Sequence, residues 1–196
     1  DNNDIERKFW KDDFSVDSEE LYNVTGTPTG WGTGTLRVPN NGKVVTAAPV
    51  APGNHYGRYS VTFTGELAVE KYIAMSLTPT NSVTCMCKQD LTTGTYLVYM
   101  RDWVAPKTFI SGVDTLVPID AANHTLELDY DSDGFSIYFD GVEIIPKTSA
   151  GSRTLSGVIG VWIWNGTTTD ILELKYLPSV SYSDDFSSDT VSGSAT

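Results

Sequence analysis

The sequence predicts an all-β protein folded as a sandwich of two antiparallel sheets, and three observations support this prediction. Segments 124–131, 134–139 and 157–164 alternate apolar and polar residues with a period of two, which is typical of half-buried strands. Asp133-Gly134 joins the first two segments, and Asp-Gly between alternating segments is a strong hairpin signal. Turn signals recur along the chain at the spacing of short strands, which is typical of sandwiches and barrels.

The expected strands follow one another along nearly the whole chain, and no segment shows convincing helical periodicity. In chain order they are 34–38, 43–47, 57–66, 71–78, 82–88, 95–103, 107–110, 124–131, 134–139, 142–145, 157–164 and 170–177. The turn signals that separate them include Asn41-Gly42, Pro52-Gly53-Asn54, Thr93-Gly94 and Asn165-Gly166. At most one helical turn is expected, over Asp17–Leu21.

Length and composition fit a single sandwich domain and exclude some classes of partner. The chain has 196 residues, of which 40% are apolar, and this is enough for a sizeable core. Its net charge is −12, and its 13 Lys and Arg residues are scattered, with Arg7-Lys8 as their one adjacent pair. We therefore expect neither a nucleic-acid partner nor attraction to an anionic membrane surface, because both need a basic patch. The apolar segments have strand length, so no membrane insertion is expected.

The chain contains two cysteines, Cys85 and Cys87, within one expected strand. Residues two apart in a strand point to the same face, and a disulfide between them would distort the strand. Because His55 and His124 are distant in sequence, the pair lacks the further ligands that a metal site needs. We expect two small buried thiols, which give no information on the redox compartment.

A short repeat links the two ends of the chain. Lys11–Ser18 contains Asp-Asp-Phe-Ser, and Ser183–Thr190 contains the same four residues again. The interpretation we favour is that each copy opens a domain of a tandem array. One domain would then span 12–180, preceded by a lead segment or linker at 1–11, and residues 181–196 would begin a following copy or form a strand donated to a neighbouring subunit. Other copies of the same domain are therefore expected partners.

Several motifs occur in an order that carries a family resemblance. They are Asp12-Asp13-Phe14, Trp31, Arg58–Phe63, Phe135–Val142, Gly157–Val161 and the last expected strand at Asp170–Leu177. In this order they resemble the concanavalin A-like lectin and glucanase superfamily over nearly all of 12–178. The resemblance implies a jelly roll of two antiparallel sheets, one of them concave. Members include lectins, laminin G-like modules, carbohydrate-binding modules and some glycosidases, and the fold does not decide among these functions.

The sequence offers one incomplete match to a glycosidase active site. Retaining glucanases of this superfamily carry a strand motif Glu-x-Asp-x-(x)-Glu, in which two carboxylates about 5–5.5 Å apart act as nucleophile and acid/base. The nearest match begins at Glu127, and Asp129 shares its face. The closing Glu of the motif is missing, because Asp131 and Ser132 stand at its two permitted positions. We therefore expect a solvated polar face here and a protein that is not an enzyme.

Aromatic side chains outside the core are the candidate ligand-binding or interface residues. Ile159, Val161 and Ile163 are expected to face the core, which leaves Trp162 and Trp164 together on the other face of that strand. Two outward-facing tryptophans form either a sugar-binding platform or an interface patch. The other candidates are Trp103, Arg101, Tyr99 and Tyr138. They join one cluster only if their strands all belong to the concave sheet.

The resemblance also implies a structural Ca²⁺ ion, because members of the superfamily often hold one near the first and last strands. The matching positions here are Asp12, Asp13 and Asp170. Ca²⁺ takes roughly six to eight oxygen ligands, of which the sequence shows only some.

These features favour a non-catalytic module of a larger, repeated extracellular, cell-surface or virion-surface protein, which binds a glycan or a cell-surface ligand in adhesion. The first alternative is a structural subunit of an extracellular filament or fibre, assembled head-to-tail through the Trp face and the terminal segments. The second alternative is a glycoside hydrolase of the same fold. Tryptophans exposed in a groove would favour ligand binding, whereas the same residues buried against another copy would favour the filament.

Overall fold

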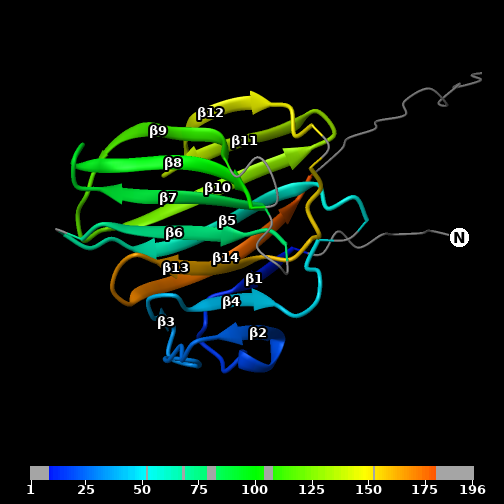
Figure 1. The fold of residues 1–196 in the computed structure, drawn as a ribbon. Helices are drawn as coiled ribbons and strands as arrows, with labels where there is room; N and C mark the ends of the chain where they lie inside the picture. The colour runs from blue at the N-terminus through cyan, green and yellow to red at the C-terminus, as the bar shows by residue number, and fades with distance from the viewer. Residues whose placement is uncertain are drawn as a thin grey trace, which may run out of the picture.

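The protein is a sandwich of two antiparallel sheets, and each sheet contains seven strands (Figure 1). The computed structural model describes residues 9–51, 53–67, 69–78, 83–103, 108–151 and 153–179. Within these residues the only helical element is one 3-10 turn, η1 (Glu19–Leu21). The predicted all-β sandwich is confirmed, and so is the single helical turn. None of the described residues forms a helix long and apolar enough to cross a membrane.

Sheet A pairs its strands in the order β1-β14-β5-β10-β11-β12, with β3 also beside β14. Its strands are β1 (Trp10–Asp12), β3 (Leu36–Val38), β5 (Gly57–Thr64), β10 (Asn123–Asp131), β11 (Gly134–Phe139), β12 (Val142–Thr148) and β14 (Thr169–Pro178). The hairpin between β10 and β11 is the one that the Asp-Gly signal predicts, and its register pairs Leu128 with Ile137.

Sheet B pairs its strands in the order β2-β4-β13-β6-β7-β8-β9. Its strands are β2 (Tyr22–Thr25), β4 (Lys43–Thr46), β6 (Lys71–Ser76), β7 (Val83–Asp90), β8 (Thr95–Asp102), β9 (Thr108–Pro118) and β13 (Gly160–Trp164). The four strands from β6 to β9 are consecutive in the chain and form a meander, whereas β13 comes from a distant part of the sequence.

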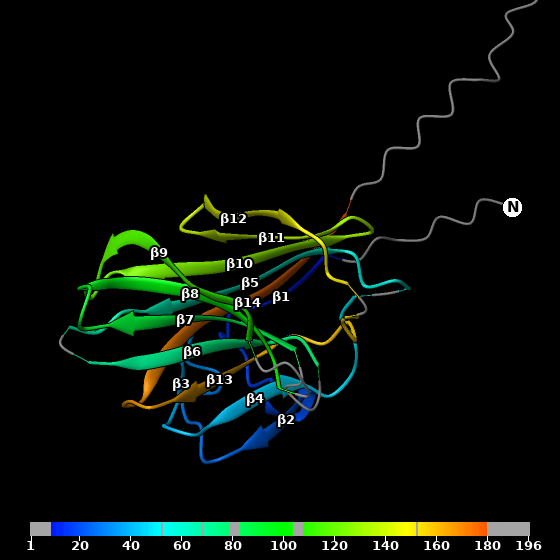
Figure 2. The ribbon, with the colours of Figure 1, turned by 45° about the horizontal axis from the view of Figure 1, so that its top comes forward.

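The insertion of late strands into both sheets gives the jelly-roll topology. In sheet B, β13 lies between β4 and β6, and in sheet A, β14 lies between β1 and β5 (Figure 2). Both strands are therefore flanked by strands from the first half of the chain. This pairing brings the two tryptophans of β13 next to β6 and so determines the surroundings of the candidate site.

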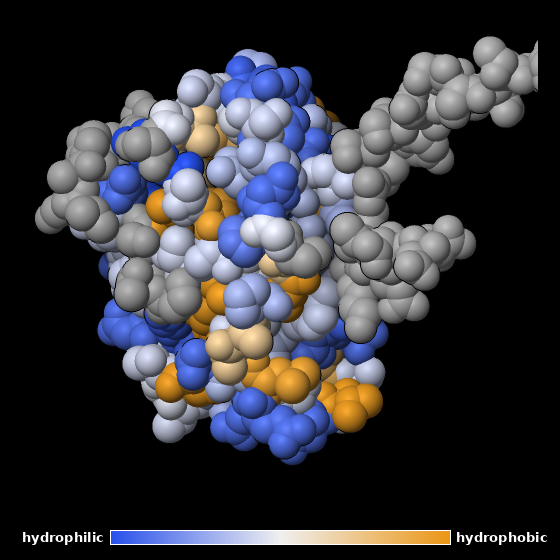
Figure 3. Space-filling view, turned by 90° about the vertical axis from the view of Figure 1, so that its right-hand side faces the viewer, coloured by the Kyte–Doolittle hydropathy of each residue, from blue (hydrophilic) through white to orange (hydrophobic). Residues whose placement is uncertain are grey.

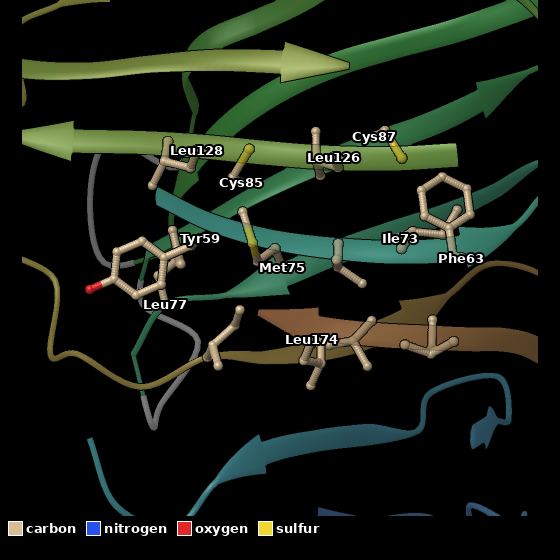
Figure 4. Packing of buried hydrophobic residues seen from close by; sticks show 14 of the residues in the cluster. Tyr59, Phe63, Ile73, Met75, Leu77, Cys85, Cys87, Leu126, Leu128 and Leu174 are labelled. Atoms are coloured by element: carbon tan, nitrogen blue, oxygen red, sulfur yellow. The ribbon is translucent and has the colours of Figure 1, made fainter. Parts of the chain in front are cut away.

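The core lies between the two sheets and consists largely of the residues that strand alternation assigns to it (Figure 4). On sheet B, Val161 and Ile163 are fully buried, and so are Cys85 and Cys87. Both cysteines are free, which confirms the prediction of two buried thiols. Alternate residues of two sheet A strands face them across the core: Leu126, Leu128, Phe135, Ile137 and Phe139. Burying one such side chain contributes roughly 1.5–3 kcal/mol, so these strands supply much of the stability.

The sequence patterns miss β1 and β2 and predict too short a range for β9. Three residues form β1, which is too few to show alternation. The observed β9 continues through Gly112 to Pro118, and both residue types are unfavourable in strand interiors. Because β9 is the edge strand of sheet B, it tolerates them.

The Asp-Asp-Phe-Ser motif near the N-terminus forms a tight corner after β1, which we call the N-terminal corner (residues 12–18). The carboxylate of Asp12 accepts hydrogen bonds from the Phe14 backbone N–H at 2.8 Å, the Ser18 hydroxyl at 2.6 Å and the Tyr22 hydroxyl at 2.7 Å. Phe14 has a φ of 56° and a fully buried side chain. The second copy of the motif, at 184–187, lies outside the described residues, so the domain boundaries stay predictions.

Large apolar side chains that are exposed lie scattered over the surface. Leu116, Val16 and Leu67 are exposed by 80%, 72% and 63%, and they belong to separate parts of the fold. Figure 3 shows the end of the molecule on the right of Figure 1, where apolar residues form small patches among polar ones.

Candidate functional site

The outer face of sheet B carries the two predicted tryptophans close to its centre. Strand β13 pairs with β4 on one side and with β6 on the other. The register places Trp162 opposite Lys43 on β4 and opposite Ala74 on β6, and it places Trp164 opposite Tyr72. Pairing between strands distant in sequence thus determines which side chains lie beside the two tryptophans.

Four aromatic side chains form a continuous group on this face, which we call the aromatic cluster: Tyr72, Trp103, Trp162 and Trp164. Tyr72 and Trp164 are stacked, with ring centroids 4.5 Å apart and an interplanar angle of 13°. The centroids of Trp162 and Trp164 are 4.9 Å apart, and Trp103 lies 5.6 Å and 5.4 Å from these two rings. All four side chains are half-buried, so part of each remains accessible to a ligand.

The sheet beneath the aromatic cluster is closed and mostly apolar. Ala74, Met86 and Thr84 are fully buried, although strand pairing places them on the outer face. The indole N–H of Trp103 donates a hydrogen bond to the hydroxyl of Thr84 at 3.1 Å. This bond holds Trp103, which follows β8, over the sheet. The cluster is therefore a fixed surface, because its rings contact one another and the strands below them.

A charged group borders the aromatic cluster beside Tyr72. Lys88 Nζ lies 3.2 Å from Glu70 Oε1 and 3.4 Å from Asp90 Oδ1. The same ammonium lies 5.8 Å from the centroid of the Tyr72 ring. A hydrogen bond from the Thr92 backbone N–H, together with the Lys88 charge, lowers the pKa of Asp90. The Asp90 carboxylate is therefore ionised at neutral pH.

Tyr99 and Arg101 border the aromatic cluster from β8. The guanidinium carbon of Arg101 lies 4.3 Å from the centroid of the Trp103 ring, a cation–π arrangement. Arg101 Nε is buried and has no hydrogen-bond partner among the described residues. Tyr99 packs against the backbone of Gly112, where an added Cβ would lie 2.7 Å from the Tyr99 ring. Burial raises the pKa of the Tyr99 hydroxyl, so it is neutral and can donate a hydrogen bond.

Tyr138, the remaining aromatic candidate, does not join this site. It belongs to β11 in sheet A, where the guanidinium carbon of Arg58 lies 4.7 Å from its ring centroid. The condition that all the candidate strands belong to one sheet is therefore not met for this residue. Alternation assigns a side chain to one face of a strand but does not say which sheet contains the strand.

The incomplete carboxylate motif also lies on sheet A. Glu127 and Asp129 share the outer face of β10, as predicted, where Glu127 pairs with Tyr138 and Asp129 pairs with Arg58. The Arg58 guanidinium lies 3.5 Å from the Asp129 carboxylate. Both side chains are partly exposed, so this part of sheet A is a polar, solvent-facing surface.

The three predicted calcium ligands each have a different protein partner. Asp12 is engaged in the N-terminal corner, Asp13 accepts a hydrogen bond from the Ser15 hydroxyl at 2.6 Å, and Asp170 lies 3.3 Å from Arg37 Nε. Among the described residues, no three His, Cys, Asp or Glu side chains are placed to hold a metal ion. These carboxylates therefore form no common site, and calcium binding stays a prediction.

A pocket of about 490 Å³ opens elsewhere, at one end of the sandwich. Its lining residues are Thr29, Arg37, Thr64, Gly65, Glu66, Lys71, Thr168 and Asp170. The charges in it are matched internally, because Lys71 Nζ lies 2.8 Å from Glu66 and Arg37 pairs with Asp170. None of the aromatic cluster contributes to it, so it is separate from the candidate site.

Sequence reasoning misses Tyr72 and Lys88 as members of the site. Both alternate outward on strands that the sequence predicts, which is the signal that identifies Trp162. What the sequence does not show is that β6 pairs with β13, and only this pairing stacks Tyr72 on Trp164.

Comparison with known proteins shows the fold. No family model and no curated protein matches the sequence. A β-glucanase of Bacillus licheniformis matches the structure with a TM-score of 0.62 and 13% identity, over 87% of this chain and 98% of that one. The fold is a jelly roll of the glucanase type.

Two further solved structures show the range of proteins that share this jelly roll. A β-1,3-1,4-glucanase (lichenase) derived from a mouse hindgut metagenome has a TM-score of 0.67 and 12% identity, over 87% of this chain and 99% of that one. The carbohydrate-binding module CBM66 from Bacillus subtilis has a TM-score of 0.52 and 15% identity, over 78% and 94%. At these identities the likeness establishes the fold alone.

These neighbours correct the prediction that the chain is not an enzyme. Glucanases, a glycosidic hydrolase and the Crh5 transglycosylase all share the fold, so most of these neighbours are enzymes by title. The prediction is wrong because it relied on the motif at Glu127 alone. It did not consider carboxylates such as Glu70 and Asp90, which the fold brings together from different strands.

Proposed function

We propose that the protein binds a carbohydrate chain on the outer face of sheet B, with the aromatic cluster as its main contact surface. The cluster itself is the observation that carries this proposal. Sugar rings have apolar C–H faces that pack against aromatic side chains, while their hydroxyls hydrogen-bond to polar groups alongside. Lys88, Tyr99 and Arg101 supply such polar groups at the border of the cluster.

Two further observations support this proposal. The outer face of sheet A is occupied by charged residues that pair with one another, as Lys11 does with Glu173 and Arg58 with Asp129. The two outer faces therefore differ in chemistry, and the group of four contacting rings lies on the outer face of sheet B. Proteins of the same fold include glucanases and a carbohydrate-binding module by title, which favours a carbohydrate ligand.

The direct test is calorimetric titration of the protein with soluble oligosaccharides, using Trp162→Ala and Trp164→Ala variants. Each substitution should weaken binding about 5- to 150-fold, because losing an aromatic contact of this size costs roughly 1–3 kcal/mol. Tyr138→Ala is the matched control, since it removes a half-buried aromatic residue from the opposite sheet. Equal affinities for the wild type and both Trp variants, with unchanged thermal unfolding, would refute the proposal.

A second candidate function, hydrolysis of the bound glycan, is favoured by one specific arrangement. The carboxylates of Glu70 and Asp90 both contact the single ammonium of Lys88, so they lie near each other beside the aromatic cluster. Glycosidases generally use two such carboxylates, one as acid and the other as nucleophile or base. The lowered pKa of Asp90 suits the nucleophile or base and not the acid.

This second candidate predicts release of reducing sugar from a β-glucan, and it predicts loss of this activity in Glu70→Gln and Asp90→Asn variants. Asp129→Asn is the control, because its carboxylate lies on the outer face of sheet A. Activity that survives both substitutions would exclude these residues as the catalytic pair. Adhesion, an extracellular or virion-surface location and filament assembly stay predictions.

A further inference from the structure

We infer that the carbohydrate bound at the aromatic cluster is acidic, a glycan with carboxylate or sulfate groups, and that Arg101 binds the anionic group. This inference rests on the proposed function and specifies its substrate class. It starts from the position of Arg101, whose guanidinium lies over Trp103 at the border of the cluster.

Arg101 differs from the other arginines that the structure describes. Arg37, Arg58 and Arg153 each lie 3.3–3.5 Å from an aspartate oxygen. Within the described part of the chain, Arg101 forms no ion pair, and its buried Nε–H has no hydrogen-bond acceptor. A buried donor without a partner is costly, so an incoming anionic oxygen gains more at Arg101 than at a paired arginine.

The geometry also leaves Arg101 ready to bind. A guanidinium that lies over an aromatic ring can still donate hydrogen bonds, because its N–H donors lie in its own plane and not along the contact with the ring. Two parallel donors of this kind match the two oxygens of a carboxylate or a sulfate. The hydrogen bond from Trp103 to Thr84 fixes the ring on which Arg101 rests, so little additional ordering is needed on binding.

The charges around the aromatic cluster favour an anion locally, although the whole chain has a net charge of −12. Glu70 and Asp90 beside the cluster both pair with the single ammonium of Lys88, which balances one of their two negative charges. Lys43 lies directly across from Trp162 and adds positive charge to the same face. Repulsion from distant acidic residues is screened beyond about 8–10 Å at physiological salt, so the local cations dominate at contact distance.

The test compares three oligosaccharides of equal length by calorimetric titration: a neutral galactan, an oligogalacturonate and a sulfated galactan. At least one acidic ligand should bind about tenfold tighter than the neutral one, which corresponds to a hydrogen-bonded charge pair. The two acidic arms distinguish carboxylate from sulfate as the bound group. Arg101→Gln should remove this preference, whereas Arg101→Lys should retain part of it, because lysine keeps the charge but not the planar fork.

Arg58→Gln is the matched control, because Arg58 also lies over an aromatic ring but is paired with Asp129 on sheet A. It should leave all three affinities unchanged. Equal binding of neutral and acidic ligands by the wild type, or a preference that persists in both Arg101 variants, would overturn the inference. If the neutral ligand still loses affinity on Trp164→Ala, the proposed function stands without it. Absence of binding to any oligosaccharide would overturn both.

Discussion

His124 is a buried polar residue held between two carboxylates. Its Nδ1 lies 2.8 Å from Asp140 and its Nε2 lies 3.0 Å from Asp120, while its side chain is only 4% exposed. Asp140 also accepts a hydrogen bond from the Thr125 backbone N–H, so the group ties β10 to the turn after β11. Sequence reasoning treats this histidine only as a possible metal ligand. Its contact with Asp140 forms only when the hairpin folds, so the sequence does not show it.

We predict that Asp120 makes the stability of the protein depend on pH. The backbone N–H of Ala122 and the His124 ring lower the pKa of the Asp120 carboxyl in the folded state. A lowered pKa contributes stability above the unfolded-state value, and this stability is lost as the pH falls through the folded-state value. The Asp120→Asn variant should therefore lose less stability than the wild type between pH 6 and about pH 3. Urea unfolding of both proteins across this range measures the difference. Identical pH profiles for the two proteins would contradict this.

At the level of single strands, much of the structure is predictable from local sequence. Alternation correctly places Ile163 in the core and Trp164 outside, because side chains on a strand alternate whatever its neighbours are. It does not reveal that Trp164 stacks on Tyr72 or that Tyr138 lies in the other sheet, because strand order depends on contacts distant in sequence. The candidate site was therefore only partly predictable.

The N-terminal corner is an element whose stability can be tested directly. The buried Phe14 side chain and the three hydrogen bonds accepted by Asp12 hold the start of the chain against the core. Asp12→Ala leaves these donors without an acceptor and should lower the free energy of unfolding by about 1–3 kcal/mol. Phe14→Ala creates a cavity and should lower it by about 3–5 kcal/mol.

Chemical denaturation monitored by tryptophan fluorescence measures both changes in the N-terminal corner. Val16→Ala is the control, because Val16 belongs to the same corner but is 72% exposed, so its truncation should have little effect. Losses as small as that of the control in both test variants would show that the corner contributes little to the fold.

For the whole molecule, the jelly roll explains why the strands from β1 to β14 depend on one another. Strands β13 and β14 each insert between strands from the first half of the chain, so neither sheet is complete until residue 178 has been placed. Conversely, every strand of both described sheets lies between Trp10 and Pro178. No strand of the described sandwich therefore contains a residue beyond 179.

The repeated motif at 184–187 leads to the last prediction, which concerns a deletion of residues 181–196. In the N-terminal corner the residues shared by the two copies have defined roles: Asp12 accepts hydrogen bonds, Phe14 fills the core, and a hydroxyl residue follows at position 18. Since this corner is already occupied in its own domain, we expect the second copy to serve another domain or another subunit.

The shortened chain should unfold at the same temperature as the full chain and should lose any self-association seen in analytical ultracentrifugation. Substituting Phe186→Ala in the full chain should have the same effect on association, because it removes the apolar residue that the second corner would bury. A shortened chain that fails to fold would mean that the tail belongs to its own sandwich, and the interpretation of the repeat as a second domain opening would then be wrong.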